Sequence, residues 1–262
     1  MKLTALAMPF RIFHWLRPIG PSCCRTSLRA PLRLAGFVVV AGLVLAMSSR
    51  GPASEQFPSK VDLSLVLAID CSWSISNEEF DLQMLATANA FRNPAVIDAI
   101  LRLPKGRIAI SLMQWSGPGS ATVALPWTIV DSRLGALEAA NKIESLKRRV
   151  AGGPTSISSA LQFAASHILK SKYSAERQVI DISADGRNNR GGPPELSRDL
   201  ATRLGITING LTILSKEYSI LDRYFRKRVI GGPGSFVEVA NDHAAYPEAI
   251  LRKLLREIPH TN

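Results

Sequence analysis

The sequence predicts an α/β fold, a three-layer α-β-α sandwich in which helices cover both faces of a mostly parallel sheet with one antiparallel edge strand. Short apolar runs alternate along the chain with segments of helical spacing, which is typical of such sheets. Two runs, 66–69 and 179–184, stop abruptly at an acid, Asp70 and Asp185. Pro126 interrupts a third run and favours a strand at the sheet edge, where a missing amide donor costs little.

Residues 1–54 differ from the rest of the chain. They hold seven basic residues and no acid, and include the uncharged apolar run 34–47. This layout is typical of a secretory signal peptide, since fourteen residues fall short of the roughly 20 that cross a bilayer. We therefore expect a signal peptide plus linker over 1–54, a folded domain over 55–262, and a secreted or periplasmic protein. An uncleaved N-terminal anchor in the inner membrane is the alternative.

The net charge of +11 does not indicate a nucleic-acid partner. Outside 1–54, the chain carries 25 of its 32 basic residues against all 21 acids, which is an ordinary balance. A basic run, 147–149, follows a predicted helix, where it complements the negative end of the helix dipole. Cys71 is the one cysteine in 55–262, so we expect no disulfide there and stability from the core.

The first half of the domain begins with a strand over 62–69. Ser76 and Glu79 have the spacing of a capping box and predict that a helix begins there and runs to about residue 91. The segments that follow are a short helix over 94–101, strands over 107–115 and 121–130, and a helix over 132–146 with Leu134, Leu137, Ile143 and Leu146 on its apolar side.

The second half continues the alternation. The expected elements are a helix over 158–170, a strand over 179–184, a helix over 195–204, a strand over 206–214, a short strand over 237–239 and a helix over 243–258. Gly231-Gly232-Pro233-Gly234 lacks the Lys-Ser/Thr ending of a phosphate-binding loop. We expect a tight turn there.

Three polar loops are predicted to meet at one edge of the sheet. Asp70, Ser72 and Ser74 follow the first strand, Thr155 stands at a helix entry, and Asp185 follows the fourth strand. Ligands bind beyond the carboxyl ends of strands in open α/β sheets, and oxygen-only groups suit a hard cation such as Mg²⁺. The alternative is that the hydroxyls cap helices and the acids accept hydrogen bonds from nearby amides.

This constellation resembles the von Willebrand factor type A (VWA) domain and its metal-ion-dependent adhesion site, whose pattern is D-x-S-x-S, then Thr, then Asp. The resemblance implies that Ser72, Ser74 and Thr155 ligate Mg²⁺ or another divalent cation through hydroxyls, while Asp70 and Asp185 act mainly through water. It also implies an open coordination position for an acidic residue of a protein partner. The phrases V-I-D-I-S-A-D-G-x-N-N-x-G, G-I-T-I-N-G-L and V-I-G-G-P-G-S-F further resemble a bacterial branch of secreted VWA-like proteins known as a domain of unknown function.

Neighbouring residues receive other assignments. Cys71 alternates with the polar positions, so we expect it in the core. Trp73 is bulky where many VWA domains have a small residue, and either narrows access to the metal or contacts the partner. Asp181 lies roughly 13 Å back along its strand and is expected to be paired and structural. His167 is expected in the core or at a helix end. Asn188 and Asn189 either line the site or shape their loop, and the second role is favoured because asparagine tolerates turn conformations.

The function predicted is therefore a non-enzymatic, secreted or periplasmic module for protein-protein interaction, with no catalytic residue. A metal-dependent, phosphatase-like hydrolase is one alternative. That chemistry needs a second carboxylate two residues after Asp70, where this chain has Ser72. A small-solute-binding protein is another alternative, although one domain offers no cleft between domains.

Overall fold

The computed structural model describes residues 59–259 of the 262. The predicted signal segment and linker, residues 1–54, lie outside the described residues. Within the described range, no helix combines the length and apolar character needed to cross a membrane.

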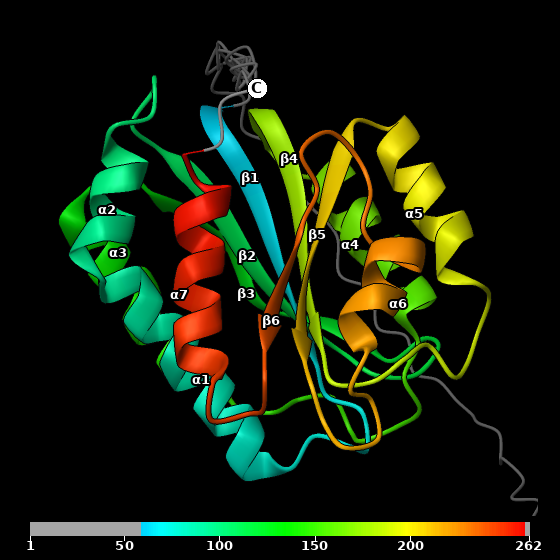
Figure 1. Ribbon diagram of the computed structural model, residues 1–262. Coiled ribbons are helices and arrows are strands. Elements are labelled where there is room, and N and C mark those ends of the chain that lie inside the picture. The colour runs from blue at the N-terminus through cyan, green and yellow to red at the C-terminus, as the bar shows by residue number, and fades with distance from the viewer. Residues whose placement is uncertain (1–58, 260–262) are drawn as a thin grey trace, which may run out of the picture. The chain divides into compact units, whose positions relative to one another are not determined.

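Six strands form one sheet at the centre of the domain (Figure 1). They are β1 (Ser59–Asp70), β2 (Ile108–Trp115), β3 (Ala121–Val130), β4 (Tyr173–Ala184), β5 (Ile206–Ile213) and β6 (Val237–Ala240). Their order is β3-β2-β1-β4-β5-β6. All neighbours pair in parallel except β2 and β3, so the antiparallel edge strand that contains Pro126 is as predicted.

Seven helices cover the two faces of the sheet. They are α1 (Asn77–Arg92), α2 (Pro94–Leu101), α3 (Arg133–Glu144), α4 (Ile157–Leu169), α5 (Pro194–Arg203), α6 (Leu221–Arg228) and α7 (Tyr246–Glu257). One layer holds α1, α2, α3 and α7, and the other holds α4, α5 and α6 (Figure 1). The three-layer α-β-α sandwich is thereby confirmed.

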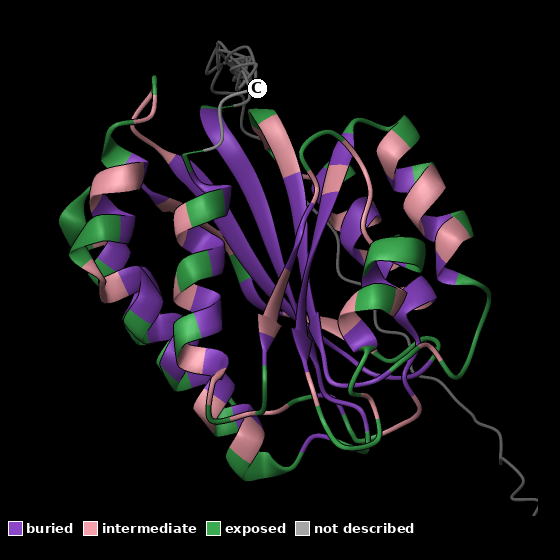
Figure 2. Cartoon of the chain, in the orientation of Figure 1, coloured by how far each residue is buried: buried purple, intermediate pink, exposed green. Residues whose placement is uncertain are grey.

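Two apolar clusters, one on each face of the sheet, form the core. Alternate β1 residues divide between them: Leu65 and Leu67 join the α1/α7 side, while Val66 and Ala68 join the α4/α6 side. The purple strands of Figure 2 show how completely the middle of the sheet is buried. Because both faces of β1 are covered, its sequence reads as a continuous apolar run.

Several local predictions are confirmed by side-chain contacts. Ser76 and Glu79 form the capping box that begins α1. Asp181 is buried in an ion pair with Lys253, with Oδ1 and Nζ 2.5 Å apart. His167 is half-buried on α4, where its ring stacks on Trp127 at 5.0 Å. Asp181 and His167 stabilise the fold away from the polar loops, whereas the capping box directly follows the loop after β1.

Two predictions about helices were wrong, and one helix was not predicted. Helix α6 was not predicted, because only Leu221 and Phe225 of its eight residues are buried. Leu134 and Leu137 are exposed, whereas Ile143 and Leu146 are buried as predicted, and α3 also buries Ala136, Ala139 and Ala140. Helix α3 packs against α1, and a stripe of small residues allows close approach. Helix α7 begins at Tyr246 rather than at residue 243, which leaves His243 in the preceding loop.

Candidate functional site

The candidate site lies where the strand order of the sheet reverses. The chain passes from β1 outward to β2 on one side, and β4 lies against β1 on the other. Ile69 pairs with Ser183, so Asp70 and Asp185 emerge from adjacent strands at the carboxyl edge, at the bottom of Figure 1. A crevice at such a reversal is the usual ligand site of open α/β sheets.

Asp70 is the most deeply buried acid of this edge, with 1% of its surface exposed. Its Oδ1 accepts a 2.7 Å hydrogen bond from the Ser72 amide, while its buried Oδ2 has no hydrogen-bond partner among residues 59–259. Burial raises the pKa of Asp70 to about 7, and the negative charge of Asp185 acts in the same direction. A cation bound nearby would stabilise the ionised form of a carboxylate in this environment.

A chain of hydroxyls joins the first polar loop to the second acid. The Ser72 and Ser74 hydroxyls lie 3.1 Å apart, and the Ser74 hydroxyl donates a 2.6 Å hydrogen bond to Asp185 Oδ1. Ser72 and Asp185 are buried, whereas Ser74 is exposed. The oxygens of these residues therefore lie close together, and only Ser74 is exposed to solvent.

Thr155 reaches the same edge through the loop that follows Asp185. Asn189 accepts a 2.9 Å hydrogen bond from the Thr155 amide and donates its own amide to the Thr155 carbonyl at 3.0 Å. A Cβ added at Gly186 would lie 3.7 Å from the Thr155 hydroxyl, so this hydroxyl lies beside the residue that follows Asp185. Asn188 accepts a bond from the Ser158 amide. The two asparagines shape the loop, as predicted.

Arg148 positions the D-x-S-x-S loop, and sequence reasoning missed this role. Its guanidinium donates to the carbonyls of Cys71 and Ile75, both at 2.7 Å, and to that of Ser72 at 3.3 Å. The sequence reading treated 147–149 only as a basic helix end. Residues 147–149 lie only a few positions before the loop that carries Thr155. This proximity is the sequence signal that could have placed Arg148 near the D-x-S-x-S loop.

His243 is the second residue at the site that the sequence reading missed. Its Nε2 lies 3.4 Å from a Glu79 carboxylate oxygen and 3.8 Å from Asp185 Oδ2. Burial alone lowers the pKa of His243, but the nearby carboxylates of Asp185 and Glu79 outweigh burial and raise it. A raised pKa places positive charge beside Asp185 more of the time.

The two residues that alternate with Asp70, Ser72 and Ser74 have opposite exposures. Cys71 is fully buried in the α1/α7 side of the core, where burial raises the pKa of its thiol to about 12. A thiol with so high a pKa is not a nucleophile at neutral pH. Trp73 is 76% exposed, and its amide donates a 2.9 Å hydrogen bond to the Gly153 carbonyl. The indole thus stands at the surface on an anchored backbone.

The donor set suits a hard cation rather than a soft one. Among residues 59–259, no group of three or more His, Cys, Asp or Glu side chains is placed to hold a metal. The site consists instead of two carboxylates and three hydroxyls, and the unpartnered Oδ2 of Asp70 is a buried acceptor that a cation or its bound water would satisfy. Oxygen ligands of this kind fit Mg²⁺.

Comparison with known proteins agrees with this architecture. The model of the family described as "Protein of unknown function (DUF1194)" matches residues 60–262. The chain belongs to this DUF1194 family. No curated protein matches its sequence.

Solved structures resemble the DUF1194 domain in fold. Proximal thread matrix protein 1 from the mussel byssus has a TM-score of 0.56 at 14% identity, over 75% of this chain and 47% of that one. The same protein with a zinc-occupied MIDAS motif has a TM-score of 0.53 at 16% identity, over 75% and 48%. The pilus adhesin SpaC from Lactobacillus rhamnosus GG, in its open conformation, has a TM-score of 0.51 at 12% identity, over 76% and 30%. These likenesses confirm the VWA-like fold, and the chain spans half or less of each structure's length.

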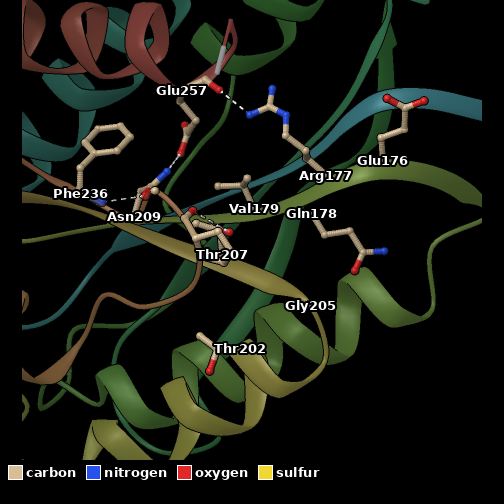
Figure 3. A pocket seen from close by; sticks show the side chains of 12 residues that line it. Glu176, Arg177, Gln178, Val179, Thr202, Gly205, Thr207, Asn209, Phe236 and Glu257 are labelled. Carbon is tan, nitrogen blue, oxygen red and sulfur yellow. Dashed lines mark hydrogen bonds between the residues drawn. The ribbon is translucent and has the colours of Figure 1, made fainter. Parts of the chain in front are cut away.

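A separate cavity of about 200 Å³ lies at the opposite edge, by the amino ends of β4 and β5 (Figure 3). Its polar groups largely bind one another. Asn209 donates a 2.6 Å hydrogen bond to Glu257 Oε1, and Arg177 donates to the carbonyls of Glu257 and Ile258. The cavity therefore sits at the end of α7 and shares no lining residue with the candidate metal site.

Proposed function

We propose that this chain is a non-enzymatic binding module that holds a divalent cation at Asp70, Ser72, Ser74, Thr155 and Asp185. One observation carries the proposal. Asp70 Oδ2 is buried with no partner in the described part of the chain, at an edge where two serine hydroxyls and Asp185 are linked by hydrogen bonds. By themselves, two acids so placed repel each other, and burial and the charge of Asp185 both raise the pKa of Asp70. A bound cation would offset both the repulsion between the two carboxylates and the cost of burying the charge of Asp70.

Mg²⁺ is the ion we propose. It takes six oxygen ligands and gives up its water reluctantly, so a site with three neutral hydroxyls and two carboxylates would leave water in the remaining coordination. The hydroxyls would contact the ion, and Asp70 and Asp185 would act mainly through water. The ion would retain much of its positive charge. The zinc-occupied MIDAS motif of the mussel protein makes Zn²⁺ the ion to compare.

The partner we propose is a protein that supplies an Asp or Glu side chain to the cation. An ion that few carboxylates neutralise still attracts another anionic oxygen. Ser74 is exposed while Asp70 and Ser72 are buried, so the open side of the site faces solvent at Ser74. With the signal segment proposed for residues 1–54, the module would act outside the cytoplasm, either free or anchored.

Calorimetric titration of the full chain with Mg²⁺ and with Zn²⁺ tests the metal. We expect one site in the wild type, and at least tenfold weaker binding in Asp70→Ala and in Asp185→Ala. Asp81→Ala, which removes an exposed acid on α1, should bind like the wild type. Equal and negligible binding by all four proteins would show that the metal proposal is wrong.

The phosphatase-like alternative finds no support at this edge. Its chemistry needs a general acid two residues after the first aspartate, and Ser72 stands there with its hydroxyl 3.1 Å from that of Ser74. An assay on aryl phosphates with and without Mg²⁺ tests the point. We expect no turnover above that of Asp70→Ala.

A further inference from the structure

A shallow groove beside the candidate metal site is lined by two segments. Trp73, Ile75, Ser76 and Asn77 follow β1, and residues 148–152 follow α3. We call it the Trp73–Arg149 groove. Its lining contains two arginines and no acid. Because Trp73 stands between Ser72 and Ser74 in the chain, a molecule that reaches those hydroxyls from this side passes the indole.

Trp73 is exposed but held in place. Its amide donates to the Gly153 carbonyl, and its Cδ1 lies so near Gly152 that an added Cβ there would come within 2.9 Å. Glycine at 152 thus lets the ring lie against the backbone. An aromatic side chain ordered in advance loses little conformational entropy on binding, and tryptophan is enriched among residues that dominate interface energy.

The two arginines of the groove have different roles. The Arg148 guanidinium already donates hydrogen bonds to the carbonyls of Cys71, Ser72 and Ile75. Arg149 is exposed, and its side chain forms no ion pair or hydrogen bond with any residue in the described range. Glu79, an acid in the first turn of α1, already accepts from the Ser76 amide and faces His243. The free positive charge of the groove is therefore that of Arg149.

We infer that the Trp73–Arg149 groove binds the stretch of the partner chain next to its metal-binding acid, and that it selects partners with a second acidic residue a few positions away. The first acid would occupy the cation, the intervening backbone would cross Trp73, and the second acid would pair with Arg149. This inference rests on the proposed function. It adds a specificity that the metal alone cannot supply, because a cation accepts any accessible carboxylate.

A peptide library with one fixed Asp tests the inference. The other positions, five on each side, are varied one at a time through Gly, Asn, Asp and Glu, and binding to the full chain is measured by fluorescence anisotropy in saturating Mg²⁺. We expect a second Asp or Glu at one or two positions to raise affinity at least fivefold over Asn. In Arg149→Gln this gain should disappear, while the affinity for the one-acid peptide stays unchanged.

A second variant and a control separate the role of Trp73 from that of Arg149. Trp73→Ala should lower the affinity for both one-acid and two-acid peptides at least tenfold. Its Mg²⁺ affinity should stay within twofold of the wild type, because Trp73 supplies no ligand to the ion. Arg203→Gln, an exposed arginine at the end of α5, should behave as the wild type.

Three outcomes would overturn the inference. If the wild type binds Mg²⁺ and one-acid peptides but gains nothing from a second acid, the inference fails and the proposed function stands. If it binds no Mg²⁺, both fail together. If dextran sulfate binds more tightly than every peptide, and does so in the presence of a chelator, the groove is a polyanion site instead.

Discussion

Ser74 donates a 2.6 Å hydrogen bond to Asp185 across 111 residues of chain, and this bond connects the loop after β1 to the loop after β4. The donor is exposed and the acceptor is buried, so the bond fixes the two loops to each other where β1 and β4 end. The candidate site therefore has part of its geometry in place before any cation binds.

The first prediction concerns this bond. Ser74→Ala should lower the free energy of unfolding by about 1–2 kcal/mol in the presence of a chelator, since a hydrogen bond to a charged, buried acceptor is lost. Urea denaturation measures the change. Ser120→Ala, at an exposed serine in a loop, should stay within about 0.5 kcal/mol of the wild type, and an equal loss in both variants would contradict the role given to Ser74.

The second prediction concerns Arg148 as a positioning residue. Arg148→Lys should destabilise the domain by about 2 kcal/mol, because an ammonium cannot reproduce the fork that serves three carbonyls. It should also weaken Mg²⁺ binding at least fivefold, since those carbonyls belong to the D-x-S-x-S loop. Arg149→Lys is the matched control and should change neither quantity. Indistinguishable Mg²⁺ titrations of the two variants would show that Arg148 acts on stability alone.

The third prediction concerns the buried ion pair between α7 and β4. Lys253 and Asp181 are both at most 1% exposed. Lys253→Met should destabilise the domain by about 3–5 kcal/mol, because it leaves Asp181 charged and unpaired. Adding Asp181→Asn should restore part of that loss, as chemical denaturation of the single and double variants would reveal. A double variant less stable than Lys253→Met alone would argue against the pairing.

The fourth prediction concerns pH and Glu257. Burial raises the pKa of this carboxyl to about 7, while its neighbours Lys253 and Asn209 oppose the shift. Because the folded-state pKa exceeds the unfolded value, protonated Glu257 stabilises the fold at low pH, and this contribution is lost as pH rises from about 4.5 to 7. The charged groups that face it are Lys253 and Asp181, with Arg177 alongside.

Glu257→Gln tests this assignment because the amide has nearly the same shape and stays neutral. We expect the fall in stability between pH 5 and pH 8 to be smaller in the variant than in the wild type, as measured by urea midpoints at each pH. Glu248→Gln, at an exposed position on the same helix, should retain the full wild-type dependence. An unchanged pH profile in Glu257→Gln would place the titration elsewhere.

Much of the fold follows from local pattern. The run that ends at Asp70 and the alternation of strands with helices predict a parallel sheet because apolar spacing reports directly which residues are buried. Helix α6 was not predicted because its eight residues include only two buried positions, Leu221 and Phe225. Two apolar positions are too few to show a helical period. The exposed Leu134 was assigned to the core because spacing counts apolar residues, whereas packing of α3 against α1 favoured alanines.

For the site, the sequence predicted that the loops after β1 and β4 lie at one edge, because the carboxyl ends of parallel strands share one edge of the sheet. The assignment of their oxygens to a cation remains a proposal. Only the tertiary structure decided what surrounds them. Arg148 reaches the Cys71 carbonyl across 77 residues, and His243 arrives beside Asp185 from the loop before α7. Such contacts depend on where distant loops pack, which local periodicity does not encode. The exposure of Trp73 and its packing against Gly152 also depend on tertiary structure. They place Trp73 in the lining of the groove.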